Sequence, residues 1–376
     1  MTTLHDLETP ALLLDAERMQ RNISRLRERL QPLGAKLRPH LKTAKCVEVA
    51  RAMMDSPNGP ATVSTLKEAD EFAAAGVTDM LYAVSIVANK FAHVSRLRQQ
   101  GVDLTVVLDS VAAAQALAAH AQTTNDHIPV LIEIDSDGHR SGVRPGDALI
   151  LDIARALAPH CELRGVMTHA GASYASYSVE AKVQMAEQER AAAVQSAQML
   201  RAAGFAAPVV SVGSTPTAHF AEHLEGVTEV RAGVYVFFDL VMAGLNVCST
   251  DDIAISVLAS VIGHQKEKGW IIVDAGWMAM SRDRGTASQP IDQGYGLVCD
   301  AQGRVITDLI MSGANQEHGI LSIRAGSSEA LPELPVGTLV RILPNHACAT
   351  GAQHDGYVVI DSAGAIQGVW PRFRGW

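Results

Sequence analysis

The stretch ATVSTLKEADEFAAAGVTDMLYAV, residues 61–84, contains one complete unit of the pattern that decides the fold. It begins with a short run containing β-branched residues, continues with the Ala-rich segment LKEADEFAAAG, and ends in the apolar run DMLYAV. The Ala-rich segment is typical of a helix, and the two runs around it are typical of strands. A strand, a helix and a second strand in this order predict a βαβ unit, because the helix returns the chain so that both strands run in the same direction.

The same alternation of strand and helix patterns recurs along the first two thirds of the chain. Eight separated strands predict an α/β fold of the (β/α)₈ barrel type, and a doubly wound open sheet is the competing architecture. The candidate strands cover residues 36–42, 61–65, 79–84, 103–110, 129–136, 162–170, 208–214 and 228–234.

The pattern changes after about residue 245. Apolar runs such as GWIIVDAG and GYVVIDSAGAIQGVW are broken by Gly and Asp, and DAQGR (300–304) and DSAGA (361–365) are typical hairpin turns. A chain of 376 residues is also longer than most single-core domains. We therefore expect a barrel over 25–245 and a mainly β domain over 246–376, while residues 1–24, which include ALLLD (11–15), could join either domain.

Composition and charge limit the possible functions. Hydrophobic residues make up 48% and charged residues 19% of the chain, as in ordinary soluble enzymes, and the net charge of −9 argues against binding to nucleic acid. The first eighteen residues have no Lys or Arg before Arg18, which is unlike a signal peptide, and no apolar run is long enough to span a membrane. Five scattered cysteines do not suggest disulfides. We expect a cytoplasmic protein without a membrane partner.

The carboxyl ends of the predicted strands carry chemically unusual residues, and this is where barrel enzymes place their active sites. A lysine at such a strand end, facing a loop of small and hydroxyl residues, suits a cofactor that has an aldehyde and a phosphate. Two simpler interpretations are that Lys42 is a surface lysine and that GSTPT caps a helix; Lys45 is expected in the following helix. The strand-end residues are His40, Lys42, His139, Arg140, Thr168, His169, Tyr174, GSTPT (213–217), Arg231 and Gly233.

The order of these motifs resembles the pyridoxal-phosphate enzymes of the alanine racemase fold. The motifs are RPHLKTAK, DSDGHRSGV, MTHAG, VGSTPT and VRAGVYVF. Three later stretches resemble the branch that contains D-serine dehydratases, D-threonine aldolases and D-threo-3-hydroxyaspartate dehydratases: VDAGWMAMSRDRGTA (273–287), GANQEHGIL (313–321) and RILPNHACATG (341–351). The resemblance covers nearly the whole chain.

The resemblance implies roles for the strand-end residues. Lys42 would carry pyridoxal phosphate and act as the base, with His169 against the cofactor ring and Tyr174 lining the pocket. Arg231 or Arg140 would face the pyridine nitrogen and lower its pKa. The phosphate would be held by Gly213, Ser214, Thr215 and the backbone at Gly233. Members of this fold are commonly homodimers, so a homodimer is expected.

His346 and Cys348, in the stretch PNHAC, are the candidate metal ligands. Residues two apart on a strand share one face, so both side chains could reach one ion, although an arbitrary His-x-Cys more often lies in a simple turn. Imidazole and thiolate suit zinc, which manganese or cobalt could replace. In the branch that the chain resembles, this position holds His-x-Cys in dehydratases and His-x-Asp in typical aldolases. A metal here would activate a leaving hydroxyl group as a Lewis acid.

Together these features predict a carbon–oxygen lyase that acts on a small D-3-hydroxy amino acid. The expected substrate is D-threo-3-hydroxyaspartate, which would give oxaloacetate and ammonia. The alternatives are D-serine dehydratase and a D-threonine or 3-hydroxy-D-aspartate aldolase that releases glycine and an aldehyde. A non-catalytic pyridoxal-phosphate carrier and a racemase are less well supported. Gln316 and His318 are candidate substrate contacts, and Arg282 or Arg284 could bind a second substrate carboxylate.

Overall fold

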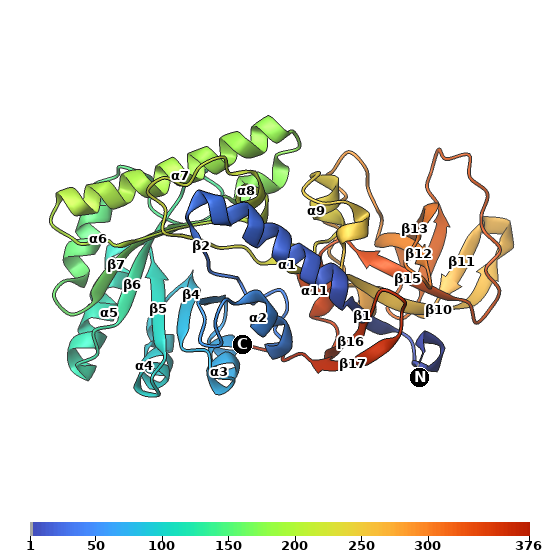
Figure 1. Cartoon of the computed structure of the whole chain (residues 1–376), viewed down its shortest axis with the longest axis horizontal. Helices are drawn as coiled ribbons and strands as arrows, with labels where there is room; N and C mark the ends of the chain where they lie inside the picture. The colour runs from blue at the N-terminus through green and yellow to red at the C-terminus, as the bar shows by residue number, and fades with distance from the viewer. Residues whose placement is uncertain (1–2) are drawn as a thin grey trace. The chain divides into compact units, whose positions relative to one another are not determined.

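The computed structural model describes residues 3–376, which form two compact units (Figure 1). One unit contains residues 25–233 and 375–376, and the other contains residues up to Ser24 and residues 234–374. The chain passes from the second of these units into the first inside helix α1 (Ala16–Leu30), and it returns after Gly233. The domain limits expected from sequence, 25–245 and 246–376, stay a prediction. No helix within residues 3–376 is long and apolar enough to cross a membrane.

The first unit is built on a parallel sheet of eight strands, as the sequence predicts. The two outer strands of the sheet order are joined by a parallel bridge between His40 and Thr62, in which the Leu41 N–H donates to the Thr62 carbonyl (2.9 Å). This bridge closes the sheet, so the alternative of an open sheet is wrong. In sheet order the strands are β2 (Lys36–Leu37), β9 (Glu229–Val230), β8 (Val209–Val212), β7 (Glu162–Thr168), β6 (Pro129–Ile134), β5 (Asp103–Leu108), β4 (Asp79–Ser85) and β3 (Ala61–Val63).

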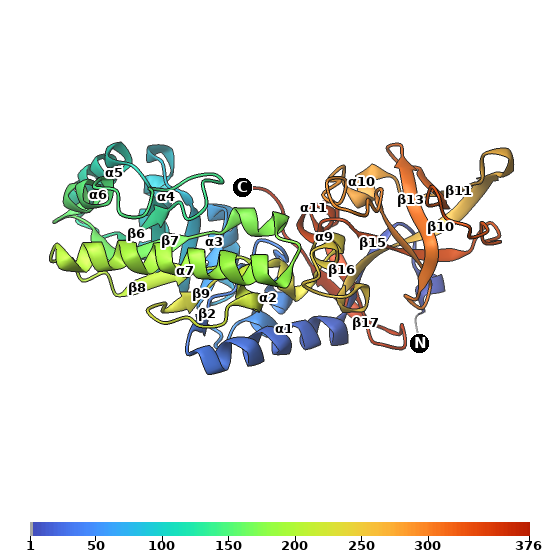
Figure 2. The same cartoon turned by 90° about the horizontal axis from the view of Figure 1, so that it is seen from above.

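Helices connect successive strands, and hydroxyl side chains begin several of them. Thr65, Ser110 and Ser178 each accept a hydrogen bond from a backbone N–H of the first helical turn, which satisfies a donor that the helix itself leaves free. The longest helix, α7, packs against β7 and β8 (Figure 2). The helices are α2 (Val47–Met53), α3 (Leu66–Ala74), α4 (Phe91–Gln99), α5 (Val111–Thr124), α6 (Leu149–Leu157), α7 (Val179–Ala202) and α8 (Thr215–Phe220).

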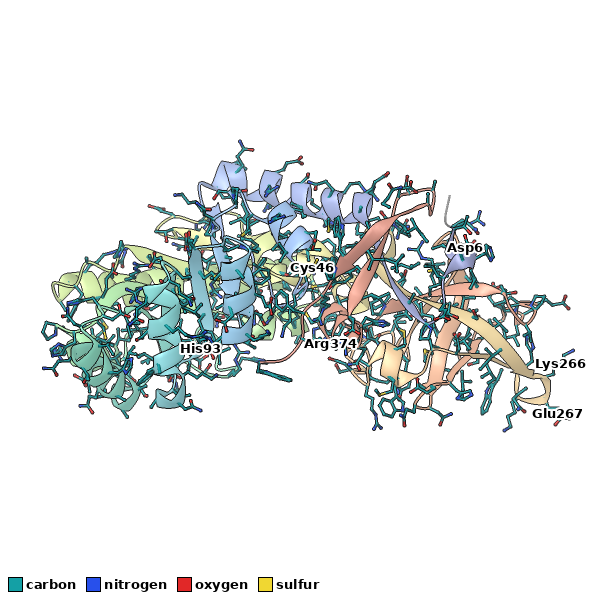
Figure 3. The ribbon with its side chains drawn as sticks, turned by 90° about the horizontal axis from the view of Figure 1, so that it is seen from below. Asp6, Cys46, His93, Lys266, Glu267 and Arg374 are labelled. Atoms are coloured by element: carbon teal, nitrogen blue, oxygen red, sulfur yellow. The ribbon has the colours of Figure 1, made fainter. Side chains whose placement is uncertain are left out.

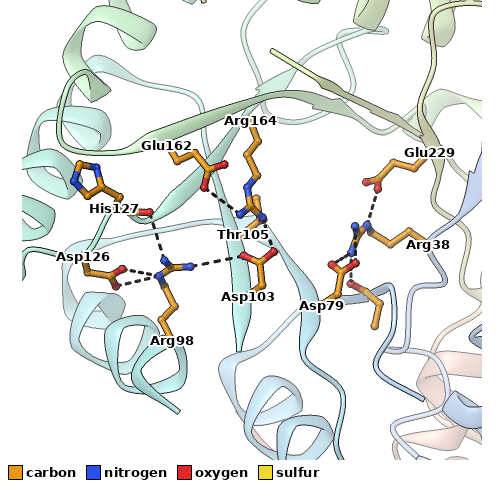
Figure 4. Close-up of polar contacts among 11 residues, drawn as sticks. Arg38, Asp79, Arg98, Asp103, Thr105, Asp126, His127, Glu162, Arg164 and Glu229 are labelled. Atoms are coloured by element: carbon orange, nitrogen blue, oxygen red, sulfur yellow. Dashed lines mark hydrogen bonds and ion pairs between the residues drawn. The ribbon is translucent and has the colours of Figure 1, made fainter. Parts of the chain in front are cut away.

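Ion pairs connect residues at the amino-terminal ends of the barrel strands (Figure 4). Arg38 pairs with Asp79 (2.6 Å) at the start of β4 and with Glu229 (2.8 Å) at the start of β9. Arg164 pairs with Asp103 (2.8 Å) at the start of β5. Both arginines form ion pairs that stabilise this end of the barrel. In barrel enzymes the active site lies at the opposite end, where the strands have their carboxyl ends.

The second unit is an antiparallel barrel extended by three further strands. Strand β10 pairs with both β11 and β15, which closes a ring in the order β10–β11–β14–β13–β12–β15. The predicted turns DAQGR and DSAGA connect β12 to β13 and β16 to β17, so both predictions are confirmed. Lys266 and Glu267 lie in the turn between β10 and β11 (Figure 3). The strands are β10 (Ile255–Gln265), β11 (Trp270–Val273), β12 (Gly296–Asp300), β13 (Val305–Ala314), β14 (Gly319–Ile323), β15 (Leu339–Pro344), β16 (Gly356–Ile360) and β17 (Ile366–Pro371).

The stretch ALLLD forms strand β1 (Ala11–Asp15) of this second unit. It pairs antiparallel with β10, where Leu12 lies opposite Val257, and parallel with β16, where Leu14 lies opposite Val359. Three short helices complete the unit: α9 (Leu240–Gly244), α10 (Trp277–Met280) and α11 (Ala347–Gly351).

One buried carboxylate joins the loops at the carboxyl end of the first barrel. Glu189 of α7 accepts hydrogen bonds from the backbone N–H groups of Ala170 and Gly213, both at 2.9 Å, and from the hydroxyl of Thr217 at 2.7 Å. Burial raises the pKa of Glu189, while these hydrogen bonds oppose the rise. The side chain therefore holds the ends of β7 and β8 and the first turn of α8 in one arrangement.

We expect Glu189→Leu to lower the free energy of unfolding by about 2 kcal/mol or more, because it leaves two buried backbone N–H donors without an acceptor at roughly 1–3 kcal/mol each. The Thr217 hydroxyl would keep only its longer contact with the Ser214 carbonyl (3.3 Å) as an acceptor in the backbone. Glu187→Gln is the matched control on the same helix, since Glu187 is half exposed and pairs with Arg190 (2.7 Å) and with the exposed His223 (3.2 Å). Its effect should be about 1 kcal/mol or less. Urea unfolding followed by circular dichroism measures both, and equal stabilities of the two variants would contradict the role of Glu189.

Candidate functional site

Lys42 lies in the turn between β2 and α2, where its side chain is exposed. Its positive charge is close enough to lower the pKa values of both His40 and His169. Lys45 precedes α2, so the expectation that it lies in the helix is wrong, and its ammonium group pairs with the buried carboxylate of Glu68 (3.3 Å). Of the two lysines, Lys42 is therefore the one whose charge acts on the histidines at the strand ends.

His169, at the end of β7, is held as a neutral imidazole. Its Nδ1 lies 3.0 Å from the carbonyl oxygen of Gly213, and because a carbonyl only accepts, Nδ1 carries the hydrogen and Nε2 does not. Burial, together with the charges of Lys42 and Arg231, lowers the pKa of His169 to about 3, although the bond to Gly213 opposes the change. The ring of Tyr174, in the short helix Gly171–Ala175, lies 6.2 Å from that of His169.

The two candidate arginines differ in how firmly they are held. Arg231 is buried after β9, where its Nε donates to the Ser211 hydroxyl (2.8 Å) and its guanidinium also donates to the Thr168 carbonyl. Arg140 lies in the loop after β6 and is exposed, yet its charge also lowers the pKa of His169. The structure therefore places both cations near His169, with Arg231 fixed by the barrel.

The turn from β8 into α8 forms a small polar cradle. Ser214 caps the helix by accepting from the Thr217 N–H (3.3 Å). The hydroxyl of Thr215 is buried and has no hydrogen-bond partner within residues 3–376. At Gly213 the backbone has φ +143°, and a side chain there would collide with the carbonyl of Arg231, so only glycine fits. Gly233 lies beside His40, where an added Cβ would come within 3.1 Å of the His40 carbonyl.

These barrel residues fit pyridoxal phosphate. The positive charges of Lys42, Arg140 and Arg231 surround imidazoles that burial keeps neutral, so the site as a whole favours an anion. The unpartnered Thr215 hydroxyl supplies a donor for a phosphate oxygen, and a lysine amine is the group that reacts with an aldehyde. Orphaned buried hydroxyls are uncommon in folded proteins, which supports a ligand at this position.

His346 and Cys348 do not lie on a strand, so the argument from strand alternation is wrong. Strand β15 ends at Pro344, His346 is the residue before α11, and Cys348 lies in the first turn of that helix. The two side chains nevertheless meet, since a hydrogen bond between them contributes to the raised pKa of His346. The turn into α11, and not a strand, therefore brings the side chains of His346 and Cys348 together.

Acidic residues surround the imidazole of His346. Its Nδ1 lies 2.6 Å from the Oδ2 of Asp283. Although partial burial lowers the pKa of His346, the hydrogen bonds to Asp283 and Cys348 raise it to about 11, and the same contact lowers the pKa of Asp283. The buried carboxylate of Asp239 accepts from the Ala347 N–H (2.9 Å), which fixes the backbone between the two candidate ligands. The cluster is therefore arranged to hold a cation.

This donor set fits a metal ion with few protein ligands. A soft thiolate and an imidazole suit zinc, and a side chain of His346 that is 42% exposed leaves the site open to solvent. Within residues 3–376 no group of three or more His, Cys, Asp and Glu side chains is placed to hold a metal ion. An ion bound by His346 and Cys348 would therefore complete its coordination with water or substrate.

The other predicted contacts lie in the turn between β13 and β14. Gln316 and His318 are both exposed there. The Asn315 N–H donates to the His318 carbonyl (2.8 Å), and the Met278 N–H of α10 donates to the Gln316 carbonyl (3.1 Å). The backbone of this turn thus supports α10, and the two side chains remain candidates for contact with a ligand.

Sequence reasoning did not find Glu189, Asp239 or Asp283. Asp283 lies in the quoted motif MSRDRG, but an acid between two arginines is usually a surface residue. Glu189 is one of several acids in a long polar helix. For each, the only signal is a contact with a residue that is distant in the sequence.

Comparison with known proteins agrees with both parts of the chain. Residues 14–241 match the family described as "Alanine racemase, N-terminal domain", and residues 254–360 match the "Putative serine dehydratase domain". The chain is 56% identical to D-threo-3-hydroxyaspartate dehydratase of Delftia sp. (strain HT23), over 100% of this chain and 99% of the relative. A solved structure of that enzyme has a TM-score of 0.96 and 55% identity, with both chains fully covered. Another structure of the enzyme is of a cysteine-to-alanine variant in the metal-free form.

More distant relatives are named for other substrates or another reaction. The chain is 27% identical to D-serine dehydratase of Dictyostelium discoideum, with 96% of each chain covered. It is 28% identical to 3-hydroxy-D-aspartate aldolase of Paracoccus denitrificans, over 97% of this chain and 92% of the relative. The identity and the coverage with the first relative are far higher than with these two. The chain belongs to the alanine-racemase-fold family of pyridoxal-phosphate enzymes, in the branch of D-threo-3-hydroxyaspartate dehydratase.

Proposed function

We propose that this chain is a pyridoxal-phosphate- and divalent-metal-dependent dehydratase that converts D-threo-3-hydroxyaspartate to oxaloacetate and ammonia. The observation that carries the proposal is the pairing of His346 with Cys348 in a chain that is 56% identical to an enzyme of that name. Variants of that enzyme replace a histidine and a cysteine two positions apart, the spacing of this pair, and the cysteine variant is described as metal-free. The metal proposed here is zinc, which manganese or cobalt could replace.

In the proposed reaction, water leaves the substrate across the Cα–Cβ bond, and the resulting enamine hydrolyses to the 2-oxo acid and ammonia. Bound pyridoxal phosphate would supply an electron sink for charge at Cα, and a bound metal would supply a Lewis acid for the β-hydroxyl. The Lys42 amine would hold the cofactor through its aldehyde and, once displaced by the substrate amine, would accept the α-proton. His169 stays neutral, because its pKa is about 3, and its bond to Gly213 orients the ring.

The polar cradle and the arginines position the cofactor in this proposal. The Thr215 hydroxyl, Ser214 and the backbone at Gly213 and Gly233 would hold the phosphate. Arg231, fixed by Ser211, would set the charge near the pyridine ring. A fixed cation disfavours a second positive charge beside it, so the ring nitrogen would stay unprotonated and the electron sink would be weaker. That weakness is a reason for a metal on the leaving group.

Arg282 is the better of the two candidates for the second carboxylate of the substrate. Arg284 already pairs with Asp292, at 2.5 Å, and also donates to the Gly294 carbonyl (3.1 Å). Arg282 is exposed, stacks on Trp277 with 5.3 Å from its guanidinium carbon to the ring centroid, and has no carboxylate partner within residues 3–376. An unpaired guanidinium next to Asp283 can bind a carboxylate with two hydrogen bonds.

An aldolase is the alternative, because cleavage of the Cα–Cβ bond needs the same cofactor and metal. Incubation with D-threo-3-hydroxyaspartate separates the two functions: a dehydratase releases ammonia and oxaloacetate in equal amounts, and an aldolase releases glycine and glyoxylate. Ammonia release from D-serine alone would indicate a D-serine dehydratase. We also propose a cytoplasmic homodimer, on the basis of the sequence pattern and the family resemblance.

The covalent role of Lys42 is tested by two matched substitutions. Lys42→Arg keeps the positive charge but removes the reactive amine, so the absorbance of the lysine-bound cofactor and all turnover should be lost. Lys45→Arg keeps the ion pair with Glu68 and should retain both properties. Absorption spectra of the purified proteins with added pyridoxal phosphate measure the difference. The reverse result would show that Lys45 binds the cofactor.

Metal removal should separate proton abstraction from elimination. In protein treated with EDTA, and in Cys348→Ala, we expect ammonia release to fall at least about 100-fold, because hydroxide is a poor leaving group without a Lewis acid. Exchange of the substrate α-proton with deuterium should continue, since it depends on Lys42. Zinc or manganese should restore the treated wild type and should restore Cys348→Ala poorly. Full activity of metal-free protein would refute the metal-dependent mechanism.

Arg282→Gln should raise the KM for D-threo-3-hydroxyaspartate by about 10-fold or more, because a hydrogen bond to a charged group contributes roughly 1.5–3 kcal/mol. The kcat should change little if the contact only binds the substrate. Lys268→Gln is the control, since Lys268 also lies over a tryptophan ring, that of Trp270, in the turn between β10 and β11. Steady-state kinetics on both variants decide, and an unchanged KM in Arg282→Gln would exclude the assignment.

A further inference from the structure

We propose that Asp283 is the positioning residue of the metal centre, which holds the ring of His346 so that Nε2 is the metal-binding atom. The inference rests on the proposed metal-dependent function. It concerns how the chain prepares one of its two ligands, rather than which residues the ligands are.

The hydrogen bond determines which ring nitrogen is available. An ionised carboxylate only accepts hydrogen bonds, so the 2.6 Å contact between Asp283 Oδ2 and His346 Nδ1 is donated by the imidazole. A nitrogen that carries a hydrogen cannot bind a metal ion, which leaves Nε2. The carboxylate also restricts rotation of the ring and makes Nε2 a better electron donor, as carboxylates beside metal-bound histidines commonly do.

The loop that carries Asp283 is fixed by hydrogen bonds of residues before and after it in the sequence. The two segments that carry Asp283 and His346 are joined at one end by the Thr350 hydroxyl, which donates to the Met280 carbonyl (2.6 Å). At the other end the Thr286 hydroxyl donates to the amide oxygen of Asn345 (2.9 Å). The contact between Asp283 and His346 lies between these two bonds along the segments. The carboxylate is therefore presented to the imidazole by a braced loop.

The same geometry argues against Asp283 as a metal ligand. The 2.6 Å contact is a hydrogen bond, so the Oδ2 of Asp283 is occupied by the N–H of His346 and Nδ1 has no lone pair for an ion that Asp283 would share with it. No group of three potential ligand side chains within residues 3–376 meets the geometry of a metal site. Asp283 therefore acts through His346.

The test measures cobalt binding rather than turnover. Metal-stripped protein with pyridoxal phosphate bound is titrated with cobalt(II) in competition with a chromophoric chelator, and the thiolate-to-cobalt absorption band reports on Cys348. Asp283→Ala should weaken cobalt binding about 10- to 100-fold, the usual effect of removing such a partner. The absorption bands at saturating cobalt should match those of the wild type, since both ligands remain.

Two further variants make the test specific. Asp283→Asn keeps an oxygen acceptor for Nδ1–H without the charge, so its Kd for cobalt should lie between those of the wild type and Asp283→Ala. Asp292→Asn removes a carboxylate of the same loop that pairs with Arg284 (2.5 Å) instead of His346, and it should bind cobalt like the wild type. Circular dichroism checks folding, and if Asp283→Ala does not fold, a Kd of Asp283→Asn equal to that of the wild type is sufficient to overturn the inference.

The possible failures can be told apart. A wild-type protein that binds no cobalt would overturn the proposed metal-dependent function and this inference together. Wild-type binding with an unchanged Kd in Asp283→Ala would overturn this inference alone. Altered ligand-field bands in Asp283→Ala at saturating cobalt would show that the carboxylate is itself a ligand, which also contradicts a positioning role.

Discussion

The arrangement of the barrel site depends on the buried carboxylate of Glu189. It accepts one hydrogen bond from the loop after β7, one from the turn after β8 and one from α8. A carboxylate offers about four acceptor sites in directions that neutral side chains cannot reproduce, so it can satisfy several donors at once. His169 and the polar cradle are fixed relative to each other because the backbone groups next to them share this one acceptor.

The two candidate sites have opposite electrostatic character. In the barrel unit, cationic side chains lie near histidines whose pKa values are lowered, which favours a phosphorylated, anionic cofactor. In the β unit, carboxylates and a thiol raise the pKa of His346 to about 11, so the same cluster stabilises positive charge. The barrel histidines have lowered pKa values first because they are buried and then because cations lie near them, whereas at His346 the contacts with Asp283 and Cys348 outweigh burial.

The chemistry of the relatives differs although their folds agree. Dehydratases and aldolases occur among the proteins that the chain resembles, and both cleave a bond to the β-carbon of a hydroxy amino acid. A metal on the β-oxygen can stabilise a leaving hydroxyl or an alkoxide, so fold and cofactor alone do not select the reaction. The residues that can select it are those around the metal and the β-substituent, which under the proposed function are Cys348 and Arg282.

The sequence by itself determined the features that depend on neighbours in the chain. Eight strands alternate with helices, hairpin turns form at DAQGR and DSAGA, and Lys42 follows a strand, because periodicity and turn residues act over a few positions. Only the tertiary structure decided that ALLLD pairs with β10 and β16, and that a helix, not a strand, brings Cys348 to His346. It also decided the contact of Asp283 with His346, which spans 63 positions. Such contacts depend on how separate elements pack, and no local pattern of residue types encodes the partner.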